Sequence, residues 1–347
     1  GSIMFGAGYS DRQGIILNAS ISQNNIFGTG NFFSLDANRG AINETYSASF
    51  TNPYATVDGL SFGMDAYKRV LDTKALTSFA AFKTDTLGAG FRLGIPIAEN
   101  DIVSLGLAAE NTSIDIFQNS PQRYKDFVNE FGTSTNNFPA TLSWARDRRD
   151  SAIWPTSGTT HRLFGEVSVP GGDLDYYKVS YNQKWYFPIT DFFTLLINTE
   201  LGYGDGYSGK NLPFFKNFFA GGNNSVRGYD LNSLGPRDDT LILGNTSTTT
   251  RRLLAVGGSK RVVGNIELMF PVPFLRDDRS LRFSLFADGG TTFNRFGQLH
   301  DFMRYSAGIA LTWVSPMGPL KVSVAEPLND EPADNLQRFQ FMFGQQF

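Results

Sequence analysis

Hydrophobic and polar positions alternate with a period of two residues along most of the chain. Residues 281–288 have one apolar face and one mixed face, formed by Leu281, Phe283, Leu285 and Ala287 and by Arg282, Ser284, Phe286 and Asp288. Successive side chains of a β-strand point to opposite faces, so this period predicts strands that are apolar on one side. The segments run to about ten residues, the length of a transmembrane strand and longer than the strands of a soluble β-sandwich. We therefore expect an all-β transmembrane barrel, with a soluble sandwich as the weaker alternative.

Sixteen segments with this pattern can be placed along the chain. Their approximate spans are residues 2–10, 14–22, 31–39, 43–51, 60–71, 77–95, 102–117, 138–147, 159–169, 174–187, 192–206, 256–270, 280–292, 302–314, 319–326 and 336–347. Every second connection from residue 52 onward carries proline, which ends strand pairing: Pro53, Pro96, Pro155, Pro188, Pro271 with Pro273, and Pro316 with Pro319. Outer-membrane barrels alternate short periplasmic turns with longer extracellular loops. The sequence thus predicts a sixteen-stranded antiparallel transmembrane β-barrel with both termini on the periplasmic side.

One connection carries a helical pattern, which predicts a short helix in an extracellular loop. We expect Ser120 to cap this helix, Pro121 to be its first residue and Gly132 to end it. An apolar stripe at helical spacing comprises Tyr124, Phe127, Val128 and Phe131. The helix would lie on the membrane surface, cap the barrel, or pack on its own rim.

The longest region without strand pattern runs from about residue 207 to 255, and connections this long are usually functional or disordered. Four phenylalanines lead into it: Phe214, Phe215, Phe218 and Phe219. Aromatic surface gains most from burial, so this segment is expected to be packed rather than disordered. We predict that it folds back into the lumen of the barrel, with Val226, Arg227, Gly228 and Tyr229 at its centre.

Arg227 is an isolated arginine in this segment, and strand parity suggests its partners. Glu267 shares a face with Asn265 and not with Ile266, while Asp288 lies on the mixed face of the following segment. Both carboxylates would then face the lumen, where an arginine can bind them through charge-assisted, bidentate hydrogen bonds. An arginine exposed to solvent in a loop is the alternative, and the pattern alone does not separate the two.

Composition narrows the class of protein further. In 347 residues no apolar run approaches the roughly 20 residues of a helical membrane span, which excludes a helical membrane protein. The net charge of −3 argues against a nucleic-acid partner. The chain has no cysteine, and its two histidines, His161 and His300, lie on unrelated segments without a positioned nucleophile. We therefore expect no catalytic site, no metal site and no cofactor.

The motif Val226-Arg227-Gly228-Tyr229 resembles a loop motif of the bacterial surface antigen superfamily of outer-membrane assembly and translocation proteins. Further matches follow in order along the chain: residues 25–30 (NIFGTG), 52–54 (NPY), 56–59 (TVDG), 154–158 (WPTSG), 218–222 (FFAGG), 303–308 (MRYSAG) and 315–320 (SPMGPL). The tetrad alone would indicate only the superfamily. The whole set covers essentially the entire chain and resembles the members that assemble outer-membrane barrels.

This resemblance implies that residues 1–347 are the barrel domain of such an assembly factor, without the periplasmic POTRA domains that precede it in the family. It implies a non-enzymatic insertase in the outer membrane of a Gram-negative bacterium. The implied partners are unfolded outer-membrane β-barrel clients, outer-membrane lipids and accessory lipoproteins, the last bound mainly through the POTRA region. The chain lacks a cysteine pair that some members carry in the long loop, which puts only a loop-stapling role in doubt.

The first and last segments would form the lateral seam of this barrel. The first contains Gly6 and Gly8, and we assign Ile3, Phe5, Ala7 and Tyr9 to the seam. On the last, Phe339, Phe341, Phe343 and Phe347 share one parity, and Gly344 interrupts the strand near its end. Glycine within a strand weakens pairing or permits a bend, and the resemblance implies that the last strand kinks inward. We predict a weak seam at which an incoming client strand pairs with an exposed edge.

Two other functions stay open. A polypeptide-translocating pore of the same superfamily, such as a two-partner secretion transporter or TamA, would share the loop motif. A passive porin would need a ring of charges around an open lumen, which a long plugging loop does not provide.

Overall fold

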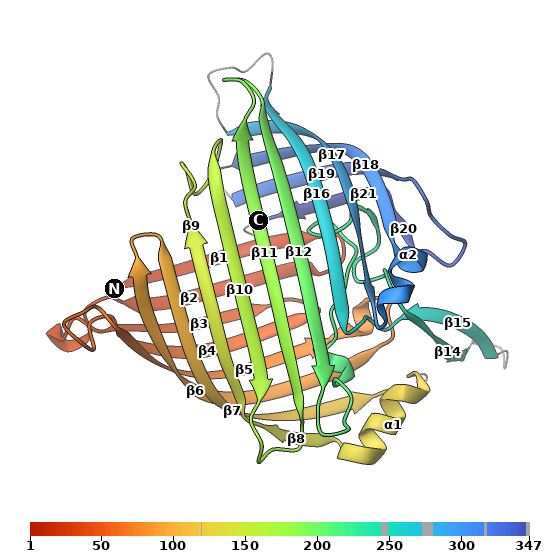
Figure 1. The fold of residues 1–347 in the computed structure, drawn as a ribbon, viewed down its shortest axis with the longest axis horizontal. Helices are drawn as coiled ribbons and strands as arrows, with labels where there is room; N and C mark the ends of the chain where they lie inside the picture. The colour runs from red at the N-terminus through yellow and green to blue at the C-terminus, as the bar shows by residue number, and fades with distance from the viewer. Residues whose placement is uncertain (119, 244–248, 273–279, 316–317, 345–347) are drawn as a thin grey trace.

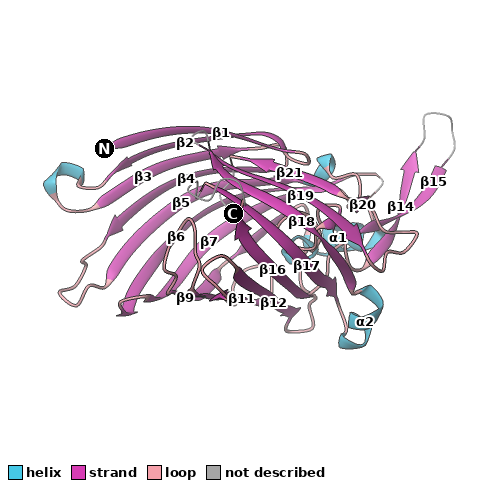
Figure 2. Ribbon diagram, turned by 90° about the horizontal axis from the view of Figure 1, so that it is seen from above, coloured by secondary structure: helices cyan, strands magenta, loops and turns pink. Residues whose placement is uncertain are grey.

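The computed structural model describes residues 1–118, 120–243, 249–272, 280–315 and 318–344. Its main element is an antiparallel β-barrel in which consecutive strands pair and the last strand pairs with the first (Figures 1 and 2). The barrel strands are β1 (Ser2–Ser10), β2 (Gly14–Gln23), β3 (Phe32–Arg39), β4 (Asn43–Asn52), β5 (Ser61–Asp72), β6 (Phe82–Ala98), β7 (Asp101–Ile116), β8 (Ser134–Asn137), β9 (Pro139–Asp147), β10 (Gly158–Ser168), β11 (Tyr176–Pro188), β12 (Thr194–Gly206), β16 (Lys260–Pro271), β17 (Leu281–Phe293), β18 (Arg304–Ser315), β19 (Gly318–Pro327) and β21 (Phe339–Phe343).

The barrel has sixteen strand positions, because β8 and β9 are two parts of one strand. Both pair with β7 in a single register, with Asn137 opposite Glu110 and Ala140 opposite Leu107. Only Phe138 separates them. The predicted sixteen-stranded antiparallel barrel is therefore confirmed.

The predicted alternation of side chains is also present. On β18, Tyr305, Ile309 and Trp313 are exposed, whereas Ser306 and Ala310, at the opposite parity, are buried. The apolar face of this strand therefore forms the outer surface of the barrel, and the small and polar face lines the interior.

Several connections gather at one end of the barrel, which we call the loop rim (Figure 1). It carries the helices α1 (Gln122–Phe131) and α2 (Leu299–Phe302) and the projecting hairpin of β14 (Arg237–Leu243) and β15 (Thr249–Ala255). The first residue of the chain lies at the end of β1 that is far from the loop rim (Figure 1). No helix among the described residues is both long enough and apolar enough to cross a membrane.

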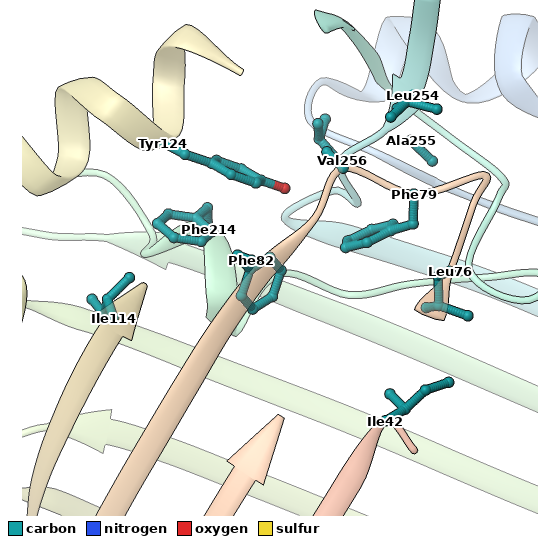
Figure 3. Packing of buried hydrophobic residues seen from close by; sticks show 11 residues of the cluster. Ile42, Leu76, Phe79, Phe82, Ile114, Tyr124, Phe214, Leu254, Ala255 and Val256 are labelled. Carbon is teal, nitrogen blue, oxygen red and sulfur yellow. The ribbon is translucent and has the colours of Figure 1, made fainter. Parts of the chain in front are cut away.

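A cluster of buried apolar side chains, the apolar cap, joins α1, the long connection after β12 and the ends of several barrel strands (Figure 3). Its members are Ile42, Leu76, Phe79, Ala80, Phe82, Ile114, Tyr124, Phe214, Leu254, Ala255 and Val256. The ring of Phe214 stacks on Tyr124 with centroids 4.0 Å apart and meets Phe82 edge-on at 5.1 Å. The helix thus packs inward, onto the cap, through the apolar stripe that the sequence predicts.

The start of this helix differs from the prediction. Pro121 precedes the first helical residue, and no side chain caps the helix. The Ser120 hydroxyl instead accepts a hydrogen bond from the Phe117 N–H and donates one to the Ala81 carbonyl. Ser120 therefore ties the segment before the helix to the residue that precedes β6, while Gly132 ends the helix as expected.

The expected turn at Pro96 is wrong. β6 continues through Pro96 to Ala98, and its register with β7 shifts between these two residues. A proline is tolerated at such a bulge because no ladder hydrogen bond is required of it. At the other end β6 begins at Phe82 rather than at residue 77, since the preceding residues bridge to the long connection, Phe79 pairing with Ala255.

Two further segments differ. The region from 207 to 255 contains the β14–β15 hairpin, which projects from the barrel and so lacks the alternation imposed by one buried face (Figure 1). The segment predicted as a single strand from 336 to 347 is divided in two. β20 (Leu336–Gln337) pairs with β13 (Gly228–Tyr229) of the long connection, and β21 alone joins the barrel.

Replacing Phe214 by alanine should loosen α1, because truncating a buried phenylalanine typically costs about 3–5 kcal/mol. The measurement is the rate of proteolytic cleavage near residues 122–131 in reconstituted protein. The matched control is Phe27→Ala, since Phe27 is 95% exposed. Equal cleavage rates in the two variants would show that the apolar cap does not hold the helix.

Candidate functional site

The connection between β12 and β16, residues 207–259, contacts inward-facing side chains of the barrel and is called the lumen loop. Its turn around the predicted tetrad depends on glycine. Gly228 has a φ of +91°, and a Cβ there would lie 3.2 Å from the Cβ of Ala325 on β19. The left-handed conformation and the close approach both favour glycine. Val226 and Tyr229, on either side, are fully buried.

Arg227 is bound by carboxylates of two neighbouring strands. Its Nε and Nη2 donate to the two oxygens of Asp288 on β17 at 2.7 and 2.8 Å, and its backbone N–H donates to Asp288 Oδ2 at 3.1 Å. Its Nη1 donates to Glu267 Oε2 on β16 at 3.1 Å. The exposed fractions of the three side chains are 3% for Arg227, 0% for Asp288 and 10% for Glu267. The bidentate pair fixes both the position and the orientation of the guanidinium group.

Charge and burial act in opposite directions on Arg227. Burial alone would lower its pKa, but hydrogen bonding to Asp288 and the charges of Asp288 and Glu267 raise its pKa above the ordinary value. The guanidinium therefore stays charged. Removing either carboxylate would leave a buried charge short of partners.

Two further residues support this cluster, and the sequence alone assigned neither of them to it. The Arg227 guanidinium lies over the Phe286 ring, 3.4 Å from its centroid. Asn265 Nδ2 lies between the loop and the wall, 2.7 Å from the Ser225 carbonyl and 2.8 Å from Asp288 Oδ1. A phenylalanine on the polar face of a strand is the signal that would have indicated the cation–π contact.

Tyr229 connects the tetrad to the last strands of the barrel. Its hydroxyl donates to the Tyr305 carbonyl on β18 at 3.2 Å, and its carbonyl accepts a hydrogen bond from Gln340 Nε2 on β21 at 2.9 Å. Burial raises the pKa of the Tyr229 hydroxyl, so it remains a neutral donor. The lumen loop is thus bonded to β16, β17, β18 and β21.

The seam between the first and last strands is short. β1 pairs with β2 along its whole length, from Ser2 opposite Ser22 to Ser10 opposite Gly14. Its register with β21 contains only Tyr9 opposite Phe343 and Ser10 opposite Met342. Toward the N-terminus, Ile3 and Phe5 are 65% and 83% exposed. Most of the β1 edge therefore has no strand partner among the described residues.

Glycines allow the two edges to cross at close range. Gly344 has a φ of +74°, and a Cβ there would lie 2.7 Å from the Ala7 carbonyl oxygen. A Cβ on Gly8 would lie 2.8 Å from the Phe343 carbonyl oxygen. Of the seam residues expected from the sequence, Phe339 and Phe341 lie on β21, and Phe347 falls outside the described residues.

The two histidines do not come together with catalytic groups. His161 lies on β10 with its Nδ1 2.8 Å from the Tyr181 hydroxyl, and His300 lies in α2. Within the ranges that the structure describes, no three side chains of the metal-ligating types gather as a possible site.

A second buried ion cluster, centred on Asp334, lies at the loop rim and gave no sequence signal beyond the polar parity of Arg304. Asp334 accepts hydrogen bonds from Arg237 Nη2 of β14 at 2.5 Å and from Arg304 Nε of β18 at 2.7 Å. Burial would raise the pKa of Asp334, but hydrogen bonds from Arg237, the Glu331 N–H and Arg304 lower its pKa below the ordinary value. This carboxylate ties the β14–β15 hairpin to the barrel.

We expect Arg227→Ala to lower the free energy of unfolding by about 3–5 kcal/mol, because both carboxylates lose their buried partner. Arg227→Lys should give an intermediate loss, since lysine keeps the charge without the bidentate geometry. The control is Arg39→Ala, whose side chain is 70% exposed and pairs with Glu44 at 3.3 Å. Equal unfolding free energies for Arg227→Ala and Arg39→Ala would contradict a structural role for the cluster.

The Asp334 cluster predicts a pH dependence. Since its folded pKa is depressed, its stabilisation is complete above the ordinary aspartate pKa of about 3.9 and is lost as the pH falls through the folded value. Hydrogen-exchange protection of the β14 amides should therefore be equal at pH 7 and pH 5 and should decrease only at lower pH. Asp334→Asn should reduce this protection at every pH. A loss of protection between pH 7 and pH 5 would show that a group other than Asp334 determines the protection of these amides.

Comparisons with known proteins agree with these features. Residues 25–347 match the family model of the Omp85 superfamily domain. The outer membrane protein assembly factor BamA of Neisseria meningitidis serogroup B is 37% identical over 384 residues, which cover 100% of this chain and 47% of that protein. BamA of Nitratidesulfovibrio vulgaris is 29% identical over 361 residues, which cover 42% of that protein. The chain spans less than half the length of these two relatives.

Solved structures give the same result. The crystal structure of BamA from Haemophilus ducreyi lacking POTRA domains 1-3 has a TM-score of 0.90 and 30% identity, covering 98% of this chain and 69% of that one. CdiB from Acinetobacter baumannii, at 14% identity and a TM-score of 0.60, shares the fold alone. This match covers 98% of this chain and 58% of the CdiB chain. The loop tetrad, the sixteen-stranded barrel and these similarities together establish that the chain belongs to the Omp85 superfamily, as a homologue of BamA.

Proposed function

We propose that this chain is the barrel of a non-enzymatic insertase that folds and inserts β-barrel proteins into the outer membrane of a Gram-negative bacterium. The observation that carries the proposal is the seam, where only two residue pairs of the described ranges join β1 to β21. Supporting it, the homologues named above are outer membrane protein assembly factors.

The seam provides a template because backbone groups in hydrocarbon must be hydrogen-bonded. Each unsatisfied group there costs several kcal/mol, so the part of β1 that has no partner on β21 among the described residues is a favourable site for an additional strand. A client strand entering beside β1 gains main-chain hydrogen bonds with a preformed edge, which is strand addition. The chain thereby lowers the barrier to insertion without covalent chemistry, and its lateral seam residues Ile3, Phe5, Ala7 and Tyr9 line that edge.

On the other side of the seam, the last strand can give way to the client. Gly344 and Gly8 permit the close crossing described above, and within the described residues β21 extends only from Phe339 to Phe343. A short strand next to flexible glycines separates at lower cost than a long uninterrupted one. The clients are then released laterally into the bilayer rather than through the lumen.

The lumen loop contributes through its contacts with the inner wall of the barrel. Arg227, Glu267 and Asp288 hold it against the wall, and the apolar cap covers it at the loop rim. This arrangement disfavours a passive porin, which needs an open channel. Because the strand number is even, both termini lie at one side of the membrane, which in this proposal is the periplasm, where unfolded clients and accessory lipoproteins arrive.

The decisive experiment locks the seam with a disulfide. Ser10 and Met342 are directly opposite each other, and Cα atoms of such pairs are close enough for a disulfide. In this cysteine-free chain, Ser10→Cys with Met342→Cys should abolish insertion of an unfolded barrel client into vesicles that contain the protein, and a reductant should restore it.

The control locks two strands away from the seam. Ser34 and Ser49 are opposite each other on β3 and β4, so Ser34→Cys with Ser49→Cys adds a disulfide without closing the seam. This variant should retain insertion. Full insertion by the oxidised Ser10–Met342 variant would reject the seam mechanism, and client-triggered conductance in the same vesicles would favour a translocating pore.

A further inference from the structure

The turn between β1 and β2 is docked on the lumen loop by one arginine. Arg12 Nε lies 2.7 Å from Asp230 Oδ1 and donates a hydrogen bond to Gln337 Oε1 at 3.0 Å. The Arg12 side chain is 34% exposed, whereas that of Asp230 is 5% exposed. A part-exposed residue in the turn of the first strand pair is thus bonded to a buried carboxylate that follows the VRGY tetrad directly in sequence.

Asp230 is held in position by contacts other than that with Arg12. Its Oδ2 accepts a hydrogen bond from the Ser78 hydroxyl at 2.8 Å, and its Oδ1 accepts one from the Leu231 N–H at 2.7 Å. Its own N–H donates to the Asn335 carbonyl at 2.9 Å. Asp230 would keep these contacts if β1 moved away, so it is a fixed acceptor to which Arg12 can return.

The other side of the seam is bonded to the same stretch of loop. Gln340 of β21 donates to the Tyr229 carbonyl, and β20 pairs with Gly228 and Tyr229. Gln337 of β20 also donates to Asp11, next to Arg12. Both edges of the seam therefore meet at residues 228–230, although their described residues pair with each other at only two positions.

We propose that Arg12 is a positioning residue that latches the first strand to the lumen loop, so that closure of the seam depends on the seating of that loop. The inference rests on the seam function proposed above and adds the residue that regulates it. With Arg227 holding the loop on β16 and β17, Arg12 holds β1 to the loop and Gln340 holds β21. The seam opens when Arg12 leaves Asp230, while the Arg227 cluster stays intact.

An ordinary surface arginine would not have this effect, because exposed ion pairs contribute little to stability. Arg39 provides the comparison within the same chain. It pairs with Glu44 of the adjoining strand, and both strands are held by a full ladder of hydrogen bonds regardless of this pair. Arg12 differs in that its partner is buried, distant in sequence and on an element that no ladder joins to β1.

The test measures seam closure directly and without a client. The Ser10→Cys, Met342→Cys protein is reduced in vesicles of phospholipid, and the rate of disulfide formation after addition of an oxidant reports the closed fraction. Arg12→Ala in this background should slow disulfide formation about tenfold, as expected for loss of hydrogen bonds to a charged group. Arg39→Ala should leave the rate unchanged.

Two further readouts separate a latch from a general structural defect. Arg12→Lys should recover much of the wild-type rate, because lysine also carries a positive charge to Asp230. Raising the salt concentration should slow disulfide formation in the arginine-containing protein and have no effect in Arg12→Ala, since salt screens a part-exposed ion pair. Protease resistance of the barrel verifies that each variant is folded.

The outcomes of this test and of the insertase experiment are distinguishable. An unchanged rate in folded Arg12→Ala overturns the latch, whatever the insertion activity is. If Arg12→Ala does not fold, Arg12→Gln, which keeps most of the side chain, replaces it, and an unchanged rate there overturns the latch equally. A slowed rate together with unchanged client insertion supports the latch and counts against the seam as the route of insertion.

Discussion

This fold depends on the closure of its β-sheet, because lipid offers no hydrogen-bond partners to the backbone groups at a sheet edge. A barrel removes the edges of a sheet by pairing the first strand with the last, and most of its strand pairs extend over the full strand length. The pair between β1 and β21 is the exception, with two opposed residue pairs among the residues that the structure describes. Closure is therefore complete in topology, but within the described part of the chain it depends on few residue pairs at one end of β1.

The lumen loop provides contacts to both sides of the seam, where the two strands share few residue pairs among the described residues. A long loop inside a barrel loses conformational freedom, and a buried arginine loses hydration, so both must be offset by specific contacts. Arg227 makes such contacts with Asp288 on β17, with Glu267 on the neighbouring β16, and with the ring face of Phe286 on β17. Once seated in this way, the loop presents Tyr229 and Asp230 to the last and first strands. The same element that is anchored on the inner wall also contacts both edges of the seam.

Much of this was accessible from the sequence because strand parity is a strict rule. The period of two residues indicated sixteen strands, and the same parity placed Glu267 and Asp288 on the inner face, where both carboxylates bind Arg227. The helix stripe and its end at Gly132 followed from helical periodicity. Local patterns of this kind are informative because each residue reports on its immediate neighbours.

Features that depend on distant parts of the chain were missed for the corresponding reason. Pairing of β20 with β13, the Asp334 cluster and the contact of Arg12 with Asp230 each join residues far apart in sequence, and nothing in either segment alone indicates the other. Pro96 was misassigned because a bulge removes the constraint that proline normally violates. Ser120 was misassigned because its hydroxyl is bonded to the Phe117 N–H and to the Ala81 carbonyl just before β6.

The most direct measurement of weak closure at the seam is residue-resolved hydrogen exchange of β1 in a lipid bilayer. A weak seam predicts that, between Ser2 and Gly8, amides directed toward β2 are strongly protected while the alternate amides, directed toward the seam, exchange rapidly. Tyr9 and Ser10, which pair on both sides, should be protected. Uniformly strong protection along the whole of β1 would mean that the seam is fully paired, and would contradict a barrel that closes weakly between its first and last strands.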